Sequence, residues 1–333
     1  MIAAVLERPG AIESSPLVLR EINAPAPRRG EIRVRVRCCA ICRTDLHVIE
    51  NDLSQRKLPL VPGHQIVGVV DQLGEGCSRL ALGQRVGIAW LRYTCGTCEY
   101  CGADRENLCE SSRYTGYDEN GGYAEYATVN EDFAYELPDA LDDVDAAPLL
   151  CAGIIGYRAL SRCGLPERGK LALFGFGSSA HIVQQLALQR GAEVFVVSRG
   201  ESHRELSRAL GASWAGERAD DLPAKVDSAI VFAPAGRLVP TALRALKKGG
   251  VLALAGIHMT PIPEMDYEDC LFYERDIRSV TANTRGDGRA LLAEAATVPI
   301  RPRTTTYPLR DANRALQDLK AGRIDGAGVL VMC

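Results

Sequence analysis

The stretch Leu171-Ala-Leu-Phe-Gly175-Phe-Gly177-Ser-Ser-Ala180 decides the fold of this chain. Its first residues are typical of a buried strand, its glycines predict a tight turn, and we expect a helix at His181–Gln189. Glycines at such a turn let the backbone approach a pyrophosphate, which then lies at the positive N-terminus of the helix. A bare glycine pattern is weak evidence, but here it has the required strand and helix on its flanks. The stretch therefore predicts dinucleotide binding, with both glycines, Ser178 and Ser179 at the cofactor.

Fully apolar segments alternate with helical ones around this turn. Near-continuous apolar strands joined by helices indicate a parallel sheet that is covered on both faces. The expected strands are Lys170–Phe174, Glu193–Val197, Ser228–Phe232, Gly250–Ile257 and Asp276–Ala282.

The chain before this region has a different texture. From Ile2 to about Ala146 it reads as short strands, and Glu31–Arg37 alternates apolar and charged residues as a half-buried strand does. Past Arg285 the pattern loosens, with a helix expected at Asp311–Leu319 and a last strand at Gly328–Met332. We therefore expect a β-rich domain followed by an α/β domain.

Length and charge exclude several classes of function. A chain of 333 residues allows about two domains, and 39 basic against 42 acidic residues give a net charge of −3. No uniform positive field attracts nucleic acid or a membrane surface. The longest unbroken apolar stretches, such as Val251–Ile257, fall far short of the ~20 residues of a membrane span, and Glu7, Arg8 and Pro9 interrupt any signal-like segment. We expect a cytoplasmic protein.

Four of the twelve cysteines lie close together in the sequence. Cys95, Cys98, Cys101 and Cys109 offer four thiolates on one loop, enough for a closed tetrahedral zinc site. A closed site is structural. The alternative is a loop of free thiols, which is less common because exposed cysteines rarely gather by accident.

A second set of metal-ligand types is scattered along the chain. Cys42, His64 and Cys151 would place two thiolates and a neutral imidazole around Zn²⁺, leaving a fourth position for water or an alkoxide. That composition is typical of a catalytic site. Each residue taken alone is weak evidence, because a lone cysteine or histidine is usually a packed core residue.

Together these motifs resemble the zinc-dependent alcohol dehydrogenases of the medium-chain dehydrogenase/reductase superfamily. The resemblance runs through residues 42–47, 63–77, the four-cysteine lobe, residues 121–126 and the Gly-Phe-Gly turn. It implies an α/β fold with a GroES-like β-rich catalytic domain at 1–152, including a structural zinc lobe at about 90–112. A Rossmann domain with a doubly wound parallel sheet would occupy 153–284, and residues 285–333 would return to the first domain.

The resemblance also assigns roles. It implies that Cys42, His64 and Cys151 bind a catalytic zinc and the four-cysteine lobe a structural one. Asp45 would orient His64, Thr44 would share its hydroxyl with the bound alcohol, and His47 would pass the proton through the cofactor ribose to solvent. Hydride would then move between the alcohol carbon and the nicotinamide. Besides His47, the resemblance places Arg43 and Ile257 near the cofactor.

Two positions depart from the family pattern. Gln65 replaces the Glu that normally follows the zinc histidine, and Gly326-Ala327 stands where relatives often carry an Arg partner for it. The acid and its partner are missing together. Removing a carboxylate near zinc should leave the metal more electrophilic, although relatives use that Glu during ligand exchange.

The end of the second strand of the Rossmann domain bears on the choice of cofactor. NAD-binding relatives carry an acid there that holds the ribose 2′-OH. This chain reads Ser198-Arg199, whose hydroxyl and guanidinium suit a 2′-phosphate, so NADP(H) is favoured over NAD(H). The alternative is that Arg199 is a solvated loop residue.

The substrate expectation rests on two positions. Trp90 resembles an aromatic residue that narrows the alcohol pocket in relatives, whereas Leu53 stands near where some carry another large aromatic. We expect medium-chain or aromatic primary alcohols and aldehydes, and a homodimer or homotetramer paired around Ser279–Asn283. Two alternatives stay open: a reductase of activated C=C or C=N bonds, and a non-catalytic redox sensor.

Overall fold

Two units of chain, each with its own sheet, make up the structure. This computed structural model describes residues 1–298 and 300–332. One unit holds residues 1–151 together with those from 282 onward, and the other holds residues 152–281. From the family resemblance we expect the chain to return to the first domain after residue 284. The second unit ends at residue 281, and Asn283 donates to the hydroxyl of Tyr135, 3.4 Å away in the first unit.

The second unit is a six-stranded sheet in which every neighbouring pair is parallel. Numbered from its first strand, the order is 3-2-1-4-5-6, that of doubly wound dinucleotide-binding domains. The strands in spatial order are β12 (Trp214–Gly216), β11 (Glu193–Val197), β10 (Lys170–Phe174), β13 (Val226–Val231), β14 (Leu246–Leu254) and β15 (Asp276–Ser279). The parallel sheet confirms the α/β expectation, with β10 and β11 at the predicted bounds.

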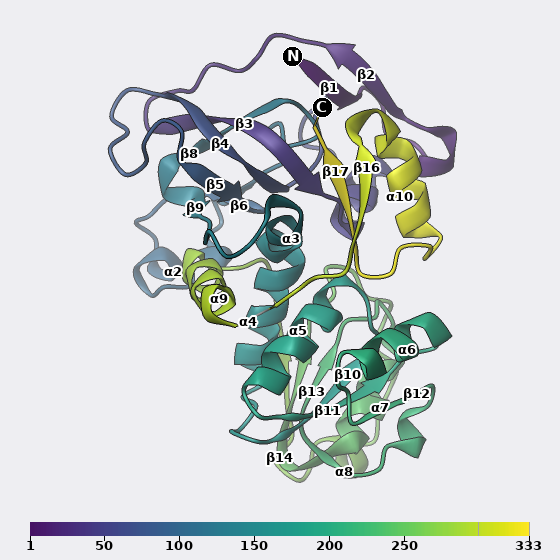
Figure 1. Cartoon of the computed structure of the whole chain (residues 1–333). Coiled ribbons are helices and arrows are strands. Elements are labelled where there is room, and N and C mark those ends of the chain that lie inside the picture. Colours follow the sequence, from purple (N-terminus) through teal and green to yellow (C-terminus); the bar gives the residue numbers. More distant parts are fainter. Residues whose placement is uncertain (299, 333) are drawn as a thin grey trace. The chain divides into compact units, whose positions relative to one another are not determined.

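Helices cover this sheet because its strands are apolar on both faces. Figure 1 shows β10, β11 and β13 side by side with α5, α6 and α7 around them. A Cβ atom at Gly156 would lie 2.5 Å from Cγ2 of Val183, so only glycine allows α4 to pack this closely on α5. The helices are α4 (Ile154–Arg162), α5 (Ser178–Gln189), α6 (Glu201–Ala209), α7 (Leu238–Ala245) and α8 (Tyr267–Cys270).

The first unit is built on a seven-stranded sheet centred on two long antiparallel strands. β3 (Glu31–Ala40) pairs with β4 (Gln65–Leu73), and the returning end of the chain adds β17 (Ala327–Val331) on the other side of β3. The remaining strands of this sheet are β5 (Arg85–Ile88), β8 (Tyr126–Asn130), β9 (Ala134–Glu136) and β16 (Thr304–Pro308). This β-rich unit agrees with the GroES-like expectation.

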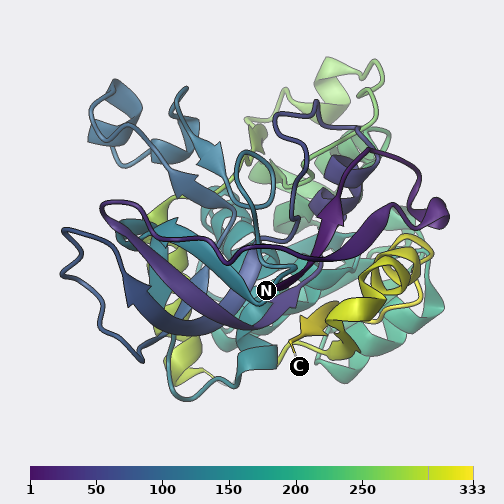
Figure 2. The ribbon, with the colours of Figure 1, turned by 90° about the horizontal axis from the view of Figure 1, so that it is seen from above.

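Smaller elements complete this unit. The hairpin of β1 (Ile2–Leu6) and β2 (Leu17–Glu21) lies beside α10 (Ala312–Lys320) (Figure 2). Asn313 on α10 exchanges hydrogen bonds of 3.1 and 2.8 Å with the backbone of Leu17. The others are β6 (Leu91–Tyr93), β7 (Arg113–Tyr114), α1 (Arg43–Ile49), α2 (Glu99–Gly102), α3 (Asp143–Pro148) and α9 (Arg285–Thr297).

Two elements were missed where the sequence pattern loosens. α9 begins at a capping box, in which Thr284 accepts from the Asp287 amide at 3.1 Å and the Asp287 carboxylate accepts from the Thr284 amide at 2.8 Å. Gly286 and Gly288 in its first turns lower helix propensity, which hides the helix from a pattern search. β16 is short and half exposed, so its apolar alternation is weak.

One helical segment is long and apolar enough on average to cross a membrane, although it contains no long unbroken apolar stretch. Asp143–Arg162 is 20 residues long, and an 18-residue stretch within it has a mean hydropathy of 1.2, which meets the criterion by length and composition. It escaped notice because polar residues break its apolar runs. However, 67% of that stretch is buried inside the protein, as in the core helix of a globular fold.

Candidate functional site

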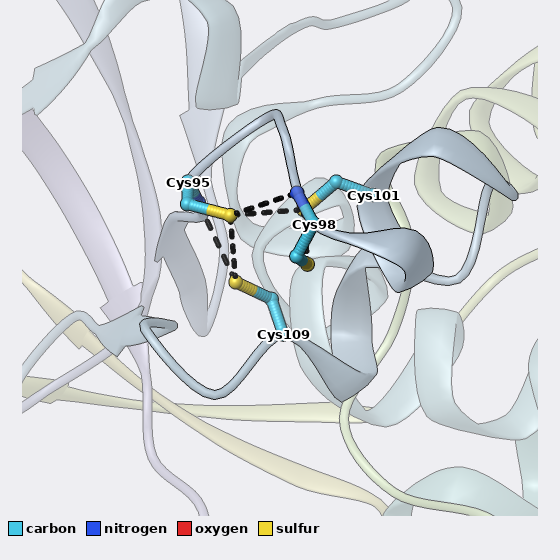
Figure 3. A group of neighbouring side chains, drawn as sticks. All are labelled: Cys95, Cys98, Cys101 and Cys109. Atoms are coloured by element: carbon cyan, nitrogen blue, oxygen red, sulfur yellow. Dashed lines mark hydrogen bonds between the residues drawn. The ribbon is translucent and has the colours of Figure 1, made fainter.

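The four-cysteine lobe brings its four sulfur atoms within 4.8 Å of one another. Strands β6 and β7 pair at the base of the loop, and α2 begins directly after Cys98. The Sγ atom of Cys95 lies 3.9 Å from that of Cys101 and 3.6 Å from that of Cys109, and Cys98 lies 3.5 Å from Cys101 (Figure 3). A tetrahedron with Zn–S bonds of ~2.3 Å has sulfurs ~3.8 Å apart. The four thiols therefore fit a metal ion of this size, and none of them forms a disulfide.

Backbone amides prepare this loop for thiolates. The Cys98 amide donates to Cys95 Sγ at 3.3 Å, and the Cys95 amide donates to Cys109 Sγ at 3.4 Å. Hydrogen bonds from the amides of Thr97 and Cys98 lower the pKa of Cys95 to about 6. A thiolate at Cys95 is therefore present at neutral pH before any metal binds.

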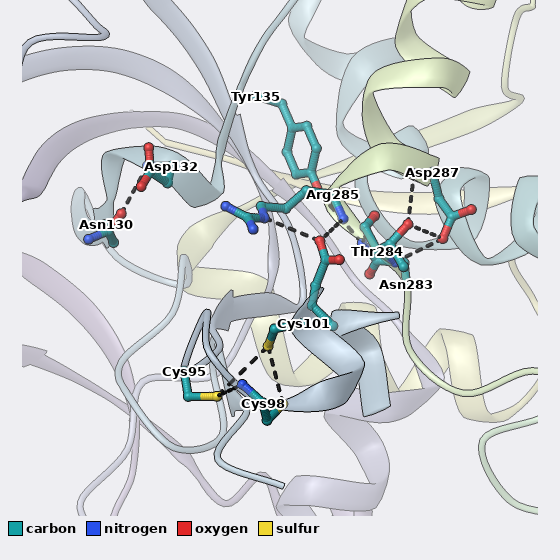
Figure 4. Close-up of polar contacts among 11 residues, drawn as sticks. Cys95, Cys98, Cys101, Asn130, Asp132, Tyr135, Asn283, Thr284, Arg285 and Asp287 are labelled. Carbon is teal, nitrogen blue, oxygen red and sulfur yellow. Dashed lines mark hydrogen bonds and ion pairs between the residues drawn. The ribbon is translucent and has the colours of Figure 1, made fainter. Parts of the chain in front are cut away.

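The lobe is tied to α9, the helix that sequence reasoning missed. The Glu106 carboxylate is buried, and its Oε1 accepts from the Arg285 amide at 2.9 Å and from the Arg285 guanidinium at 3.2 Å. Figure 4 shows Arg285 beside the capping residues Thr284 and Asp287. The returning chain thus anchors the loop that carries the four cysteines.

Cys42, His64 and Cys151 come together from three separate elements of the first unit. Cys42 is the N-cap of α1, His64 directly precedes β4, and Cys151 lies in the π-helical turn Leu149–Gly153. Their ligand atoms lie within 4.8 Å of one another, and the two sulfurs are 4.0 Å apart. A π-helical turn is typical of functional positions in helices.

The orientation of His64 fits a metal ligand. His64 Nδ1 lies 3.0 Å from Asp45 Oδ1, while its Nε2 atom is buried and has no hydrogen-bond partner. The carboxylate fixes the tautomer in which Nδ1 carries the proton, which leaves the Nε2 lone pair for a metal. Two sulfurs and one imidazole suit zinc.

Protons occupy this set when no metal is bound. Burial lowers the pKa of His64, but Asp45 and Cys42 outweigh it and raise the value to about 10. A hydrogen bond from Cys151 lowers the pKa of Cys42 well below its usual value, and the same contact with burial raises that of Cys151. A metal ion bound here displaces these protons.

The Asp45 carboxylate is satisfied by three donors. Its Oδ2 accepts from the Cys42 amide at 2.8 Å and from the Tyr123 hydroxyl at 2.8 Å, in addition to the contact of Oδ1 with His64. With 1% of its surface exposed, this charge depends on them. Tyr123 was not singled out from the sequence, because its motif gives no sign of where its hydroxyl points.

Helix α1 also carries the two residues expected to move a proton. Thr44 is buried, with Oγ1 3.6 Å from Cys42 Sγ. His47 is half-buried, and its Nδ1 lies 2.8 Å from Asp52 Oδ2. Asp52 was missed because it follows the helix in a loop outside every motif. Arg43 is exposed and reaches the backbone oxygen of Leu319 at 3.4 Å.

Trp90 lies against the metal-ligand set within an aromatic cluster. Its ring meets the His64 ring edge-on, with centroids 4.9 Å apart. It stacks on Tyr114 at 4.8 Å and on Tyr117 at 5.8 Å, two residues that sequence reasoning did not identify. Leu53 packs against the same cluster, so the structure brings together both residues of the substrate expectation.

The glycine turn lies at the point where the strand order of the second unit reverses. Gly175 follows β10 with a φ of +89°, and a Cβ atom there would come within 3.0 Å of the Ala233 amide nitrogen just beyond β13. Gly177 is the N-cap of α5, and nothing lies within 4 Å of the position its Cβ would take. The backbone at Gly177 is thus open directly before the first turn of α5, where the amides at a helix N-terminus suit a pyrophosphate.

The end of β11 is more crowded with charge than the sequence suggested. Ser198 is buried and Arg199 exposed, and Arg204 Nη1 donates to their backbone oxygens at 2.6 and 2.8 Å. Glu201, an acid not weighed in the sequence analysis, pairs with Arg204 and Arg208, whose hydrogen bonds lower its pKa. Ile257 lies beyond β14 and is 53% exposed.

The structure shows the surroundings of Gln65 and Gly326, the two positions that depart from the family pattern. Gln65 is buried at the start of β4. Gly326 has a φ of +90°, and a Cβ atom there would lie 2.1 Å from the backbone oxygen of Arg303. The turn therefore excludes any side chain at Gly326 itself.

Comparisons with known proteins agree over the whole chain. Residues 28–139 match the alcohol dehydrogenase GroES-like domain and residues 180–297 the zinc-binding dehydrogenase family. The chain is 51% identical to a probable alcohol dehydrogenase, AdhA, of Mycobacterium tuberculosis, over 100% of its length and 97% of that protein. It is 34% identical to an alcohol dehydrogenase of Geobacillus stearothermophilus, over 99% of both chains. A cinnamyl alcohol dehydrogenase structure from Sorghum bicolor superposes with a TM-score of 0.89 at 26% identity, covering 99% of this chain and 97% of that one.

The thiolate of Cys95 gives a first test. In metal-stripped, reduced protein we predict that iodoacetamide labels Cys95 with a half-maximal rate near pH 6, because its pKa is lowered to about 6 and the thiolate prevails above that pH. Cys163 serves as control, since burial raises its pKa to about 11 and shields it. Peptide mass mapping reads both sites. A half-maximal rate for Cys95 at the ~8.5 of an ordinary thiol would contradict the amide effect.

Proposed function

Because this chain belongs to the zinc-type alcohol dehydrogenases of the medium-chain dehydrogenase/reductase superfamily, we propose that it interconverts an alcohol and an aldehyde with a nicotinamide cofactor. The observation that carries the proposal is the unpartnered Nε2 of buried His64 beside the sulfurs of Cys42 and Cys151. Three ligands of this kind leave a fourth position for a substrate oxygen. Thr44 and His47 stand two and five residues after Cys42 on the same helix.

The residues would hold two zinc ions with different tasks. Cys42, His64 and Cys151 would hold the catalytic ion, and the four-cysteine lobe the structural one. A bound zinc ion supplies Lewis acidity, which lowers the pKa of an alcohol hydroxyl. A solved relative from Pyrobaculum aerophilum, 25% identical with a TM-score of 0.89 and covering 99% of both chains, is described as a cobalt- and zinc-bound alcohol dehydrogenase, which supports this assignment.

Proton movement falls to this chain's own side chains. The Thr44 hydroxyl, held near Cys42, accepts the alcohol proton and donates its own onward. His47 takes that proton toward solvent, and Asp52 holds the ring through Nδ1. A carboxylate that accepts from Nδ1–H leaves Nε2 as the atom that receives the proton.

The cofactor expected at the glycine turn is NADP(H), with NAD(H) as the alternative. A nicotinamide accepts or supplies the hydride. Arg199 supplies a positive charge at the end of β11, and Arg204 and Arg208 neutralise the nearby carboxylate of Glu201. A 2′-phosphate would therefore meet net positive charge there.

The proposed substrates are medium-chain or aromatic primary alcohols and aldehydes. Trp90, stacked with Tyr114 and Tyr117 beside His64, offers aromatic surface near the expected reaction centre. The sorghum relative is by its name a cinnamyl alcohol dehydrogenase, which supports an aromatic substrate. A homodimer or homotetramer stays a prediction. The edge strand that would pair, β15, ends at Ser279 rather than reaching Asn283.

Zinc analysis tests the two metal sites. Freshly purified protein should hold two zinc ions per chain, and Cys42→Ala should keep about one with the fold intact. Cys98→Ala should lower the thermal midpoint, because a structural zinc contributes to the folding free energy. Elemental analysis with thermal denaturation measures both, and wild-type protein free of zinc would overturn the assignment.

Kinetics test the proton path. His47→Gln should depress alcohol oxidation most below neutral pH, by at most the ~10²–10⁴-fold typical of proton-transfer groups. Asp52→Asn should shift the pH–rate profile in the same direction by less, and Thr44→Ala should cost more than either. Asp71→Asn, which breaks the ion pair with Arg33, is the matched control. A wild-type profile in His47→Gln would remove it from the path.

Steady-state rates with both cofactors test the preference. One or two charge-assisted hydrogen bonds to a 2′-phosphate should favour NADPH by about 10- to 100-fold in kcat/KM. Ser198→Asp with Arg199→Ile should invert this, because it installs a diol acceptor and removes the phosphate partner. Arg218→Ile, an exposed arginine paired with Asp220, should leave it unchanged. Equal or better use of NADH by wild-type protein would show that Arg199 is a solvated residue.

A further inference from the structure

The hydroxyl of Tyr123 reaches the metal-ligand set through Asp45. Tyr123 is fully buried, and its hydroxyl donates to Asp45 Oδ2 at 2.8 Å. The other two donors to this carboxylate are the Cys42 amide and His64 Nδ1, which belong to proposed ligands. Among the described hydrogen bonds of Asp45, the one from Tyr123 is therefore the single anchor outside the ligand residues.

The backbone around Tyr123 is also fixed against the segment that carries His64. Amides of residues 121, 122 and 123 donate to the oxygens of residues 61, 63 and 62, at 2.7, 2.9 and 3.0 Å. A Cβ atom at Gly63 would lie 2.3 Å from Cδ1 of Tyr123, so the ring occupies the space that a side chain next to His64 would need. The phenol and the imidazole are thus held in one rigid frame.

The hydroxyl can only donate in this setting. Burial and the Asp45 carboxylate raise the pKa of Tyr123 well above its usual value, so the proton stays on the phenol oxygen. A hydrogen bond to an ionised, buried carboxylate is stronger and more directional than one between neutral groups. Tyr123 therefore fixes the plane of the Asp45 carboxylate.

We propose that Tyr123 is a positioning residue for the catalytic metal, which acts through Asp45 to hold His64 with Nε2 toward the ion. This inference rests on the proposed function in that it takes Cys42, His64 and Cys151 as zinc ligands. Outer partners of this kind orient the ligand and slow its departure from the metal. A phenylalanine at this position would fill the same space but donate no hydrogen bond. The Asp45 carboxylate would then be held only by the Cys42 amide and His64 Nδ1, which belong to the proposed ligands.

The test is the rate at which holoenzyme gives up its catalytic zinc to a chromophoric chelator. Tyr123→Phe should lose that zinc about 10-fold faster than wild type, if the low end of the ~10–100-fold loss in metal affinity that outer partners cost falls on the release rate. The four-cysteine site should keep its zinc and serves as the internal control. Tyr135→Phe is the matched control, because Tyr135 is equally buried but its hydroxyl bonds Asn283.

A double mutant tests the route through Asp45. If Tyr123 acts through this carboxylate, Tyr123→Phe should add less than about twofold to the zinc-loss rate of Asp45→Asn. The visible spectrum of cobalt-substituted protein should also shift in Tyr123→Phe toward that of Asp45→Asn, and stay unchanged in Tyr135→Phe. A merely structural tyrosine would lower the thermal midpoint without moving the spectrum.

The possible outcomes distinguish a failure of the Tyr123 role from a failure of the proposed zinc site. If Tyr123→Phe loses zinc at the wild-type rate and keeps the wild-type cobalt spectrum, the positioning role is overturned. The role is also overturned if Tyr123→Phe raises the zinc-loss rate as much in the Asp45→Asn background as it does in wild type. Wild-type protein without zinc at the Cys42 site overturns the proposed function and the inference together. Accelerated loss that vanishes in the Asp45→Asn background supports the inference.

Discussion

The buried carboxylate of Asp45 is the interaction on which the site depends. One oxygen accepts from His64, and the other closes the capping box that starts α1 by accepting from the Cys42 amide. The same charge therefore orients one proposed ligand and fixes the helix that begins at another. A buried carboxylate destabilises the fold unless hydrogen-bond donors surround it. Loss of one of these contacts therefore weakens the others. Cys42, Thr44 and His47 all take their positions from that helix.

Each metal-ligand set is preorganised by hydrogen bonds rather than by the metal alone. In the lobe, backbone amides lower the pKa of Cys95 to about 6, and the Glu106–Arg285 pair fixes the loop to α9. At the open set, Cys151 donates toward Cys42, and the Asp45 carboxylate holds Nδ1 of buried His64 so that Nε2 is left for a metal. Metal binding then displaces protons from ligands that these hydrogen bonds already hold in place. The lobe is closed with four sulfurs, and the open set keeps a position for chemistry.

The strands of the parallel sheet and the proposed metal ligands could be predicted from the sequence, but most residues that contact those ligands could not. β10 and β11 were predicted because continuous apolar burial on both faces leaves a clear signal. α9 was missed because Gly286 and Gly288 weaken its pattern. Tyr117 was missed because a loop brings it against Trp90, and no spacing encodes such proximity. Asp52 was missed because it lies outside every motif, although it follows His47 by only five residues. In the second unit, Glu201 at the start of α6 was missed because its pairing with Arg204 and Arg208 leaves no pattern that the motif search covers. Asp45 and Thr44 were reached only through the family resemblance, since Asp45 meets His64 across 19 residues of chain.

X-ray absorption at the zinc edge of the purified holoenzyme tests the central claim most directly, because it counts the atoms that surround the metal. One closed four-sulfur site and one site with two sulfurs, an imidazole and an oxygen should average to about three sulfurs at ~2.3 Å and one nitrogen or oxygen at ~2.0–2.1 Å per zinc. The imidazole of His64 should add its outer-shell scattering. A shell of sulfur alone, or one dominated by nitrogen and oxygen, would contradict the account of an open site built around His64.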